Sequence, residues 1–312
     1  MEIKFRMSNT CLEILNQAVE KLRLAGIDRP RTNAELLLGA VLGKSKVDLY
    51  LDKDRILTSY EIEKFNQFIK ERISHKPVQY IIGTVEFFDL EFKVDERVLI
   101  PRPETETLVE AVIEQLKDKE KPKIIDLGTG SGAIAISLAK NLKEAFVYAT
   151  DVSRDALEVA KENAVRNKVE NQIEFLWGDL FDPLRDKNLE GQIDCVVSNP
   201  PYVSRDEFET LPKEIKDYEP IVALASEGEG VFFHKKIIEN SVGFLKKRGL
   251  LALEMALGQA EKVANLIHQS GDFSNTEIIK DLSGIDRVVK AIKRSTDEAD
   301  GNSNMEIGLA KK

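Results

Sequence analysis

The sequence predicts an α/β protein in which a mostly parallel sheet, with helices on both faces, follows a small all-α domain. From Lys123 onward, short apolar runs alternate with segments whose apolar residues recur at helical spacing, and this alternation is typical of βαβ units. In the first 75 residues the periodic segments are helical. The chain is long enough for one large domain and one smaller one.

The N-terminal helices are predicted from apolar spacing and capping signals. Residues 11–22 carry leucine and valine at helical intervals. Thr32 with Glu35, and Thr58 with Glu61, each have the spacing of a capping box, in which the first side chain accepts from a backbone N–H three residues later. We therefore expect three helices, two of them beginning at these boxes.

The domain organisation follows from where the patterns change. Pro77 interrupts the helical pattern, and 85–88 and 91–94 read as two short strands of a hairpin. The expected parts are a helical, substrate-binding domain over 1–75, a β-hairpin linker over 76–100, the α/β domain over 101–294, and a polar, disordered tail over 295–312.

The α/β domain has five candidate parallel strands and a terminal antiparallel pair. The proline-stiffened segment 99–106 leads into a helix whose first turn is rich in acids. The predicted strands are 124–127, 147–150, 173–177, 193–197 and 250–254, with helices starting at Ala133, Asp155 and Gln259, and the last pair is 277–280 with 287–292.

Composition favours a cytoplasmic protein without a membrane segment. Of its 312 residues 42% are hydrophobic and 32% are charged, and no apolar run approaches the roughly 20 residues that cross a bilayer. The start of the chain lacks a signal-peptide core. Cys11 and Cys195 lie in apolar patterns and are expected to be reduced, buried thiols.

The net charge and the spacing of the histidines argue against nucleic acid and a metal ion as ligands. A formal net charge of −9 argues against a surface that wraps nucleic acid. The basic cluster of residues 246–248 is placed at a predicted helix end, where cations favour the helix dipole. The histidines are too far apart in sequence to suggest a metal site.

A glycine-rich loop joins the first strand of the sheet to its first helix. It reads Gly128-Thr129-Gly130-Ser131-Gly132, and its backbone N–H groups and the helix N-terminus suit a bound cofactor. The same residues with Ala133 also fit the looser dinucleotide fingerprint, so a nicotinamide enzyme remains open here. Asp151, ending the next strand, is placed to accept from a ribose in either class.

The ends of the next two strands favour S-adenosyl-L-methionine, with S-adenosyl-L-homocysteine as the product. Asp179 is placed to accept from an adenine amino group, and Leu180 to pack on the ring. The fourth strand ends in a tetrapeptide without an evident hydride acceptor or catalytic acid, which is Asn199-Pro200-Pro201-Tyr202.

The tetrapeptide suits a planar amide or amine as methyl acceptor. Its prolines lack backbone N–H groups, so the polar main-chain atoms of the loop are mainly carbonyls. We expect the Asn199 oxygen and the Pro200 carbonyl to accept the two N–H bonds of an acceptor amide, while Tyr202 stacks on its plane. The catalytic candidates are therefore Asn199, Pro200, Pro201 and Tyr202.

From residue 10 to 293 the sequence resembles the glutamine N5-methyltransferases of peptide-chain release factors, the PrmC/HemK family. The resemblance rests on residues 101–106, 126–132, 199–202, 218–220 and 281–287. It implies a seven-stranded, Rossmann-like class I methyltransferase fold and methylation of the glutamine in a Gly-Gly-Gln motif of class-1 release factors. Family cofactor residues map onto 128–132, Asp151, Leu180 and Asn199, and substrate contacts onto 199–202.

Two departures and two alternatives accompany the resemblance. The family usually reads Glu-Ile-Gly where Glu254-Met255-Ala256 stands, and some relatives carry an aromatic residue at Leu180. An adenine-N6 methyltransferase on DNA or RNA would use the same tetrapeptide, although the acidic charge balance disfavours it. The non-enzyme alternative is a binding module that acts through its helical domain.

Overall fold

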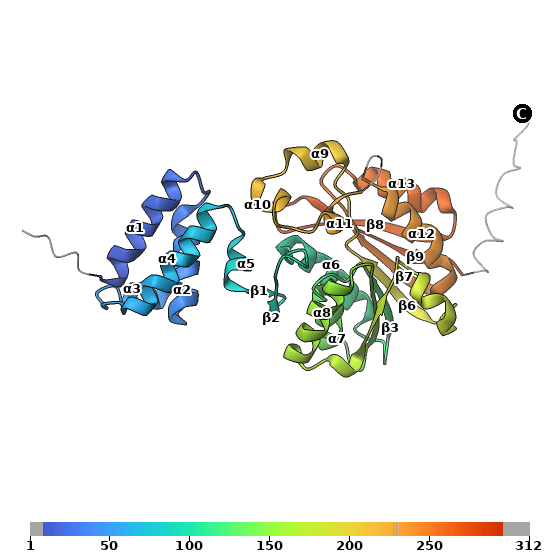
Figure 1. Ribbon diagram of the computed structural model, residues 1–312. Helices are drawn as coiled ribbons and strands as arrows, with labels where there is room; N and C mark the ends of the chain where they lie inside the picture. The colour runs from blue at the N-terminus through green and yellow to red at the C-terminus, as the bar shows by residue number, and fades with distance from the viewer. Residues whose placement is uncertain (1–8, 227, 229, 296–312) are drawn as a thin grey trace, which may run out of the picture. The chain divides into compact units, whose positions relative to one another are not determined.

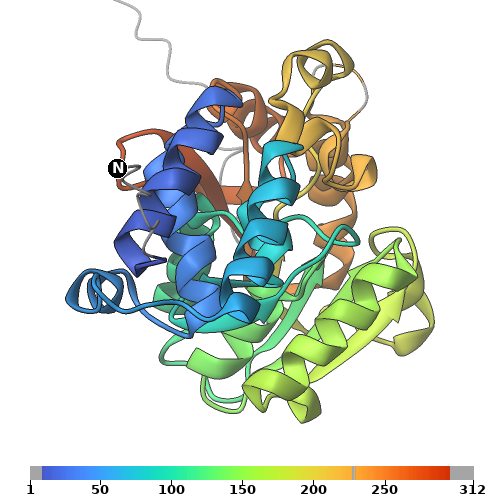
Figure 2. The same ribbon diagram turned by 60° about the vertical axis from the view of Figure 1, so that its left-hand side comes forward.

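A computed structural model describes residues 9–226, 228 and 230–295 of the chain (Figures 1 and 2). By their contacts, the described residues form two compact units. The first comprises those of Met1–Thr84 and Pro212–Tyr218, and the second those of Val85–Leu211 and Glu219–Lys312. The expected tail beyond Ser295 lies outside the described residues.

The first unit is helical, and its longer helices, blue to cyan in Figure 2, pack around one apolar core. Cys11, Leu22, Leu37 and Phe65 are among the side chains buried there. Its elements are α1 (Cys11–Leu24), α2 (Pro30–Leu42), α3 (Lys46–Leu51), α4 (Ser59–Ile73), α5 (Val78–Ile82) and the short α10 (Lys213–Lys216).

One predicted capping box is confirmed and the other is wrong. The Thr58 side chain accepts from the backbone N–H of Glu61, and the Glu61 side chain accepts from that of Thr58. The box predicted at Thr32 does not form, because α2 begins two residues earlier with Pro30 in its first turn. Proline pre-sets the helical φ and lacks the N–H that a cap would satisfy.

The predicted hairpin forms one residue earlier than expected at each strand start. It consists of β1 (Thr84–Phe87) and β2 (Leu90–Lys93). Phe87 and Phe92 meet edge to face, with ring centroids 5.9 Å apart, and both are buried in the core of the second unit. The hairpin is therefore held to that unit by its aromatic side chains.

Within the described residues, seven strands of the second unit form one sheet in the order β5-β4-β3-β6-β7-β9-β8 (Figure 1). The first five in this order pair in parallel, and β9 is antiparallel to both neighbours. The predicted α/β fold is confirmed. The strands are β3 (Lys123–Leu127), β4 (Phe146–Asp151), β5 (Ile173–Trp177), β6 (Ile193–Ser198), β7 (Leu245–Glu254), β8 (Phe273–Lys280) and β9 (Asp286–Lys293).

At the centre of the sheet both faces are buried under helices, which explains why β3 and β6 read as nearly continuous apolar runs. Cys195 and Val197 of β6 point into a core shared with α6 and α7, whereas Val196 between them points into a core shared with α12 and α13. The covering helices are α6 (Pro103–Leu116), α7 (Ala133–Asn141), α8 (Arg154–Asn167), α12 (Phe232–Phe244) and α13 (Ala260–Ser270).

The basic cluster 246–248 does not cap a helix. α12 ends at Phe244 and the cluster forms the first residues of β7. Lys246 and Lys119 both pair with the buried carboxylate of Asp194, at 2.7 and 2.8 Å. These ion pairs hold the pKa of Asp194 below its usual value against the effect of burial, so part of the cluster is structural.

No helix in the described ranges has the length and apolar character that a membrane span requires. The two cysteines are buried, as predicted, and lie in the cores of different units.

Candidate active site

A cavity of about 350 Å³ opens in the second unit at the carboxyl ends of β3, β4 and β6. Open α/β sheets bind ligands at this edge. Several predicted site residues line it together, although they are far apart in sequence. These are Gly128, Asp151, Asp179, Leu180, Asn199, Pro200 and Pro201.

The glycine loop is held in shape from behind the cavity. The Thr129 hydroxyl donates to Asp126, 2.7 Å away, and the Gly130 N–H donates to the Asp151 carboxylate at 2.8 Å. Gly128 and Gly130 have φ values of 70° and 55°, and nothing lies where their Cβ atoms would be. The loop thus leaves its backbone open to a ligand. Ser131 and Gly132 complete the turn into α7, and the Ser131 carbonyl accepts from Asn163 at 2.9 Å.

We expect Gly132→Ala to destabilise the protein by about 1–3 kcal/mol. Gly132 has φ +83°, and a Cβ there would stand 2.8 Å from Ile136 Cδ1 and 3.2 Å from the Ala160 Cβ. Urea unfolding would measure the loss. Gly243→Ala is the matched control, because a Cβ on that helical glycine meets nothing within 4 Å. Equal stability of the two variants would contradict the packing argument.

Asp151 connects the loop to the next helix. One carboxylate oxygen accepts from Gly130 and the other from the Ser153 N–H, each at 2.8 Å. Burial nevertheless raises the pKa of Asp151 above its ordinary value, while these backbone donors act in the opposite direction. The side chain lines the cavity, where its remaining lone pairs can accept from a ligand.

The loop after β5 brings Asp179 and Leu180 to the cavity. Leu180 has φ +43°, an uncommon left-handed conformation for a branched side chain. Gly178, two residues earlier, cannot be replaced freely, because a Cβ there would lie 2.9 Å from Pro183. Backbone strain of this kind persists where the surrounding structure enforces it, and it often marks a functional site.

The acceptor tetrapeptide leaves β6 as a loop without helix or strand. The Asn199 Nδ2 donates to the Thr105 hydroxyl at 3.2 Å, so its Oδ1 is left to accept from a ligand. Tyr202 does not line the cavity with the other three residues. Its carbonyl accepts from Gln259 at 3.2 Å, and burial raises the pKa of its phenol.

An ion pair and a buried acid flank this loop. Arg102 Nη2 lies 2.7 and 2.8 Å from the two carboxylate oxygens of the buried Glu219, and this joins the proline-rich segment to the chain after the tetrapeptide. Glu254, at the end of β7, is 1% exposed, and burial raises its pKa to about 7. Both acids lie in sequence stretches that the family resemblance singled out.

Sequence reasoning missed the wall of the cavity supplied by α12 and α11 (Ile221–Leu224). The adjacent aromatic residues Phe232 and Phe233 line it, as do Pro220 and Val222. Two adjacent aromatic residues that follow a glycine-rich stretch could have indicated this wall of the cavity from the sequence. Leu99, from the proline-rich segment, also lines the cavity.

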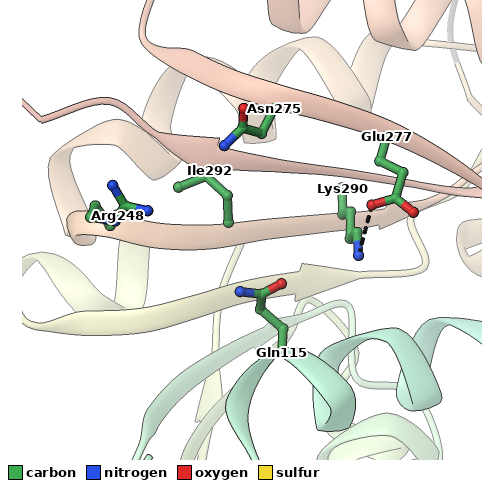
Figure 3. Close-up of a pocket in the computed structure, with 6 residues that line it drawn as sticks. All are labelled: Gln115, Arg248, Asn275, Glu277, Lys290 and Ile292. Carbon is green, nitrogen blue, oxygen red and sulfur yellow. Dashed lines mark ion pairs between the residues drawn. The ribbon is translucent and has the colours of Figure 1, made fainter. Parts of the chain in front are cut away.

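A second depression, on the sheet, is lined mostly by polar and charged side chains (Figure 3). Lys290 and Glu277 form an ion pair across it at 2.9 Å. Arg248, near the start of β7, also lines this depression, whereas the candidate site lies where the parallel strands end. It brings together none of the predicted site residues.

Known families and proteins match both units. A model described as the PrmC N-terminal domain matches residues 13–83, and one described as the methyltransferase small domain matches 105–217. A release factor glutamine methyltransferase of Fusobacterium nucleatum is 41% identical over 286 residues, which cover 90% of this chain and 79% of that protein.

Two further comparisons bear on the family and on the fold. The release factor glutamine methyltransferase of Chlorobaculum tepidum is 41% identical over 281 residues, covering 88% of this chain and 95% of that one. The solved catalytic domain of hMettl16 in complex with the MAT2A 3′UTR hairpin 1 matches with TM-score 0.53 and 19% identity, over 78% of this chain and 85% of that chain. At this identity the likeness concerns the fold alone.

The fold and the family models define a class I methyltransferase, so the nicotinamide alternative is set aside. The chain belongs to the release factor glutamine methyltransferase family.

Proposed function

We propose that this cytoplasmic enzyme transfers a methyl group from S-adenosyl-L-methionine to the side-chain amide nitrogen of the glutamine in a Gly-Gly-Gln motif of class-1 release factors. The observation that carries the proposal is the cavity that brings the glycine loop, Asp151 and Asn199 together in a member of this family. Bound there, the cofactor supplies an electrophilic methyl group on a sulfonium sulfur.

The residues around the cavity fit this cofactor. Gly128 exposes backbone without a side chain, and Asp151 offers carboxylate oxygens for ribose hydroxyls. The lining contributed by Leu180, Val222 and Phe233 is apolar and suits the faces of an adenine ring, with Asp179 beside them as an acceptor for its amino group. Thr129, Gly130, Ser131 and Gly132 shape the loop that carries these contacts.

The acceptor loop orients a poor nucleophile. A carboxamide nitrogen has its lone pair delocalised into the carbonyl, so its N–H bonds must be held in one direction. The Asn199 Oδ1 and the Pro200 carbonyl each accept a hydrogen bond from one of these N–H groups. Both oxygens stabilise the nitrogen more strongly as it gains positive charge. Pro201 stiffens the loop. Tyr202 ends it outside the cavity lining, and the stacking of its ring on the amide plane remains a prediction. No base is needed before transfer, because the proton leaves after the new N–C bond has formed.

The helical domain is the part we assign to the protein substrate. A release factor is much larger than the cavity, so further contacts must lie away from the glutamine. We assign them to residues 1–75, joined by the linker 76–100 to the methyltransferase domain 101–294. Support comes from the family model that matches this region separately from the methyltransferase model.

The test is a transfer assay with methyl-labelled S-adenosyl-L-methionine and a purified class-1 release factor. A second release factor, with alanine in place of the Gly-Gly-Gln glutamine, is the control. Label on the intact factor alone is the expected result. Label on both factors would contradict the acceptor assignment, and label on neither, with cofactor binding measured, would direct the search to nucleic-acid acceptors.

A further inference from the structure

Among the described residues of the second unit, the two most exposed large apolar side chains are leucines. Leu282 is fully exposed and Leu257 is 72% exposed. Leu282 lies in the turn between β8 and β9, and Leu257 lies in the loop between β7 and α13. Since β9 is antiparallel to β7, the start of β9 and the end of β7 meet at one edge of the sheet. Both leucines therefore stand at the edge where the acceptor tetrapeptide leaves β6.

The loop that carries Leu257 is tied to the acceptor tetrapeptide. Gln259 is buried, its Oε1 accepts from the Ala256 N–H at 3.1 Å, and its Nε2 donates to the Tyr202 carbonyl at 3.2 Å. Gly258 has φ +83°, a conformation that glycine adopts without strain. Leu257 is thus held on a fixed turn beside the loop that we assign to the methyl acceptor.

The turn that carries Leu282 is built around the carboxylate of Asp281. One oxygen accepts from the backbone N–H groups of Ser283 and Ile285, at 2.8 and 3.0 Å, and the other accepts from Arg287 Nε at 2.9 Å. The Asp281 N–H donates in turn to the Ile285 carbonyl at 2.8 Å. The Leu282 side chain takes part in none of these bonds, so the turn keeps its shape without it.

Arg287 connects the two turns. Its carbonyl accepts at 2.9 Å from the N–H of Met255, two residues before Leu257, and its guanidinium pairs with Asp281, next to Leu282. The two leucines therefore belong to one surface, which we call the leucine rim.

The same arginine connects the leucine rim to the acceptor site. The Arg287 guanidinium lies 3.9 Å from the Glu104 carboxylate in the first turn of α6. The next residue of that turn, Thr105, is hydrogen-bonded to Asn199 at 3.2 Å. These contacts place the rim near the amide that we assign to the methyl acceptor.

The charged residues on either side of Leu282 form ion pairs within the chain. Lys280 pairs with Asp286 at 2.5 Å, and Asp281 pairs with Arg287 at 2.9 Å. Charges that already have partners attract a further charged group weakly. The leucine rim therefore suits an apolar partner better than a charged one.

A single exposed leucine is ordinary on a protein surface. These two differ because both are held on fixed turns beside the acceptor site. A glutamine side chain is short, so a substrate whose amide reaches Asn199 must bring its backbone to this edge of the sheet. We propose that Leu257 and Leu282 are contacts for the protein substrate, and that they bind apolar side chains next to the methylated glutamine. The identity of that substrate rests on the proposed function.

Kinetics test the effect on the substrate. We expect Leu257→Ala and Leu282→Ala each to raise the KM for the release factor about tenfold, the cost of one lost apolar contact, with kcat and cofactor affinity unchanged. Val165→Ala is the matched control, because it shortens an exposed apolar side chain of α8, away from the cavity lining. An unchanged KM in both leucine variants would overturn the proposal.

A spin label tests the contact without activity. Both native cysteines are buried, so Leu282→Cys supplies an exposed thiol for the label. We expect a saturating release factor to restrict the motion of this label and to leave a label on Val165→Cys unchanged. Unchanged motion at Leu282→Cys, with binding measured separately, would overturn the proposal even if the factor is methylated. A restricted label without methyl transfer would instead refute the proposed function and leave the contact standing.

The same label distinguishes two other occupants. Restriction that grows with the concentration of the enzyme alone would assign the leucine rim to a second copy of this chain. Restriction by nucleic acid and not by the release factor, with a steep dependence on salt, would assign it to a phosphate backbone. Either result would overturn the proposal.

Discussion

We expect Asn199→Ala to lower turnover by a factor of about 10² or more while leaving the fold and most of the cofactor affinity intact. Asn199 lines the cavity, and its Nδ2 is taken by Thr105, so the Oδ1 is the atom placed to accept from the substrate amide. Alanine removes that acceptor from the transition state. Single-turnover transfer to a release factor would measure the loss, and calorimetry would measure cofactor binding.

Asn240→Ala is the matched control for this variant. Asn240 lies on the exposed side of α12, where its amide donates to the Lys236 carbonyl of the previous turn, so turnover should not change. Normal turnover of Asn199→Ala would show that the acceptor role is wrong. A loss of cofactor affinity as large as the loss of turnover would move Asn199 from the acceptor site to the cofactor site.

The second large effect concerns the cofactor. We expect Asp151→Ala to weaken S-adenosyl-L-methionine binding by about 10- to 100-fold, because a hydrogen bond to a charged group is worth about 1.5–3 kcal/mol. The change removes the ribose acceptor and also releases the Gly130 N–H that the carboxylate holds at 2.8 Å. Titration calorimetry would measure the dissociation constant, with the exposed Asp118→Ala as control.

A cofactor analogue that lacks the ribose hydroxyls separates the loss of the ribose acceptor from the loss of the Gly130 hydrogen bond. If Asp151 binds the ribose, the analogue binds the unaltered enzyme more weakly than the cofactor does, whereas Asp151→Ala binds both alike. This is a double-mutant cycle in which the ligand carries one of the changes. An equal loss for the analogue in both proteins would mean that Asp151 acts through the loop alone, and an unchanged cofactor dissociation constant would rule out the ribose assignment.

The sheet was predictable because its strands carry an unambiguous pattern. β5 was predicted with its observed bounds, since Ile173–Trp177 is a short run rich in branched and aromatic residues between turn signals. The strand β7 was predicted too short, because Lys246–Arg248 are charged and pair only through contacts that the sequence does not reveal. The start of α2 was misplaced because local capping spacing was given more weight than Pro30.

The site was predictable where it requires a particular backbone conformation. It was not predictable where a residue belongs to the site only because of how the chain packs. The glycine loop and the tetrapeptide stand out because glycine and proline constrain φ in ways that other residues do not. Phe233 and Val222 were missed because an apolar residue that lines a cavity looks like one that fills a core. Thr105 lies in the segment 101–106 that carries the family resemblance, but no role could be given to it from the sequence, since its partner Asn199 is distant along the chain.

That distance along the chain has a consequence for the folding of the enzyme during its synthesis. Thr105 and its partner Asn199 are separated by 94 residues. Contacts of such long range form late, because closing a long loop costs entropy before any contact rewards it. A nascent chain that has not yet released Asn199 from the ribosome can already hold the glycine loop in place, but it has no oriented acceptor amide. The chain therefore becomes competent for methyl transfer only after most of it has been synthesised.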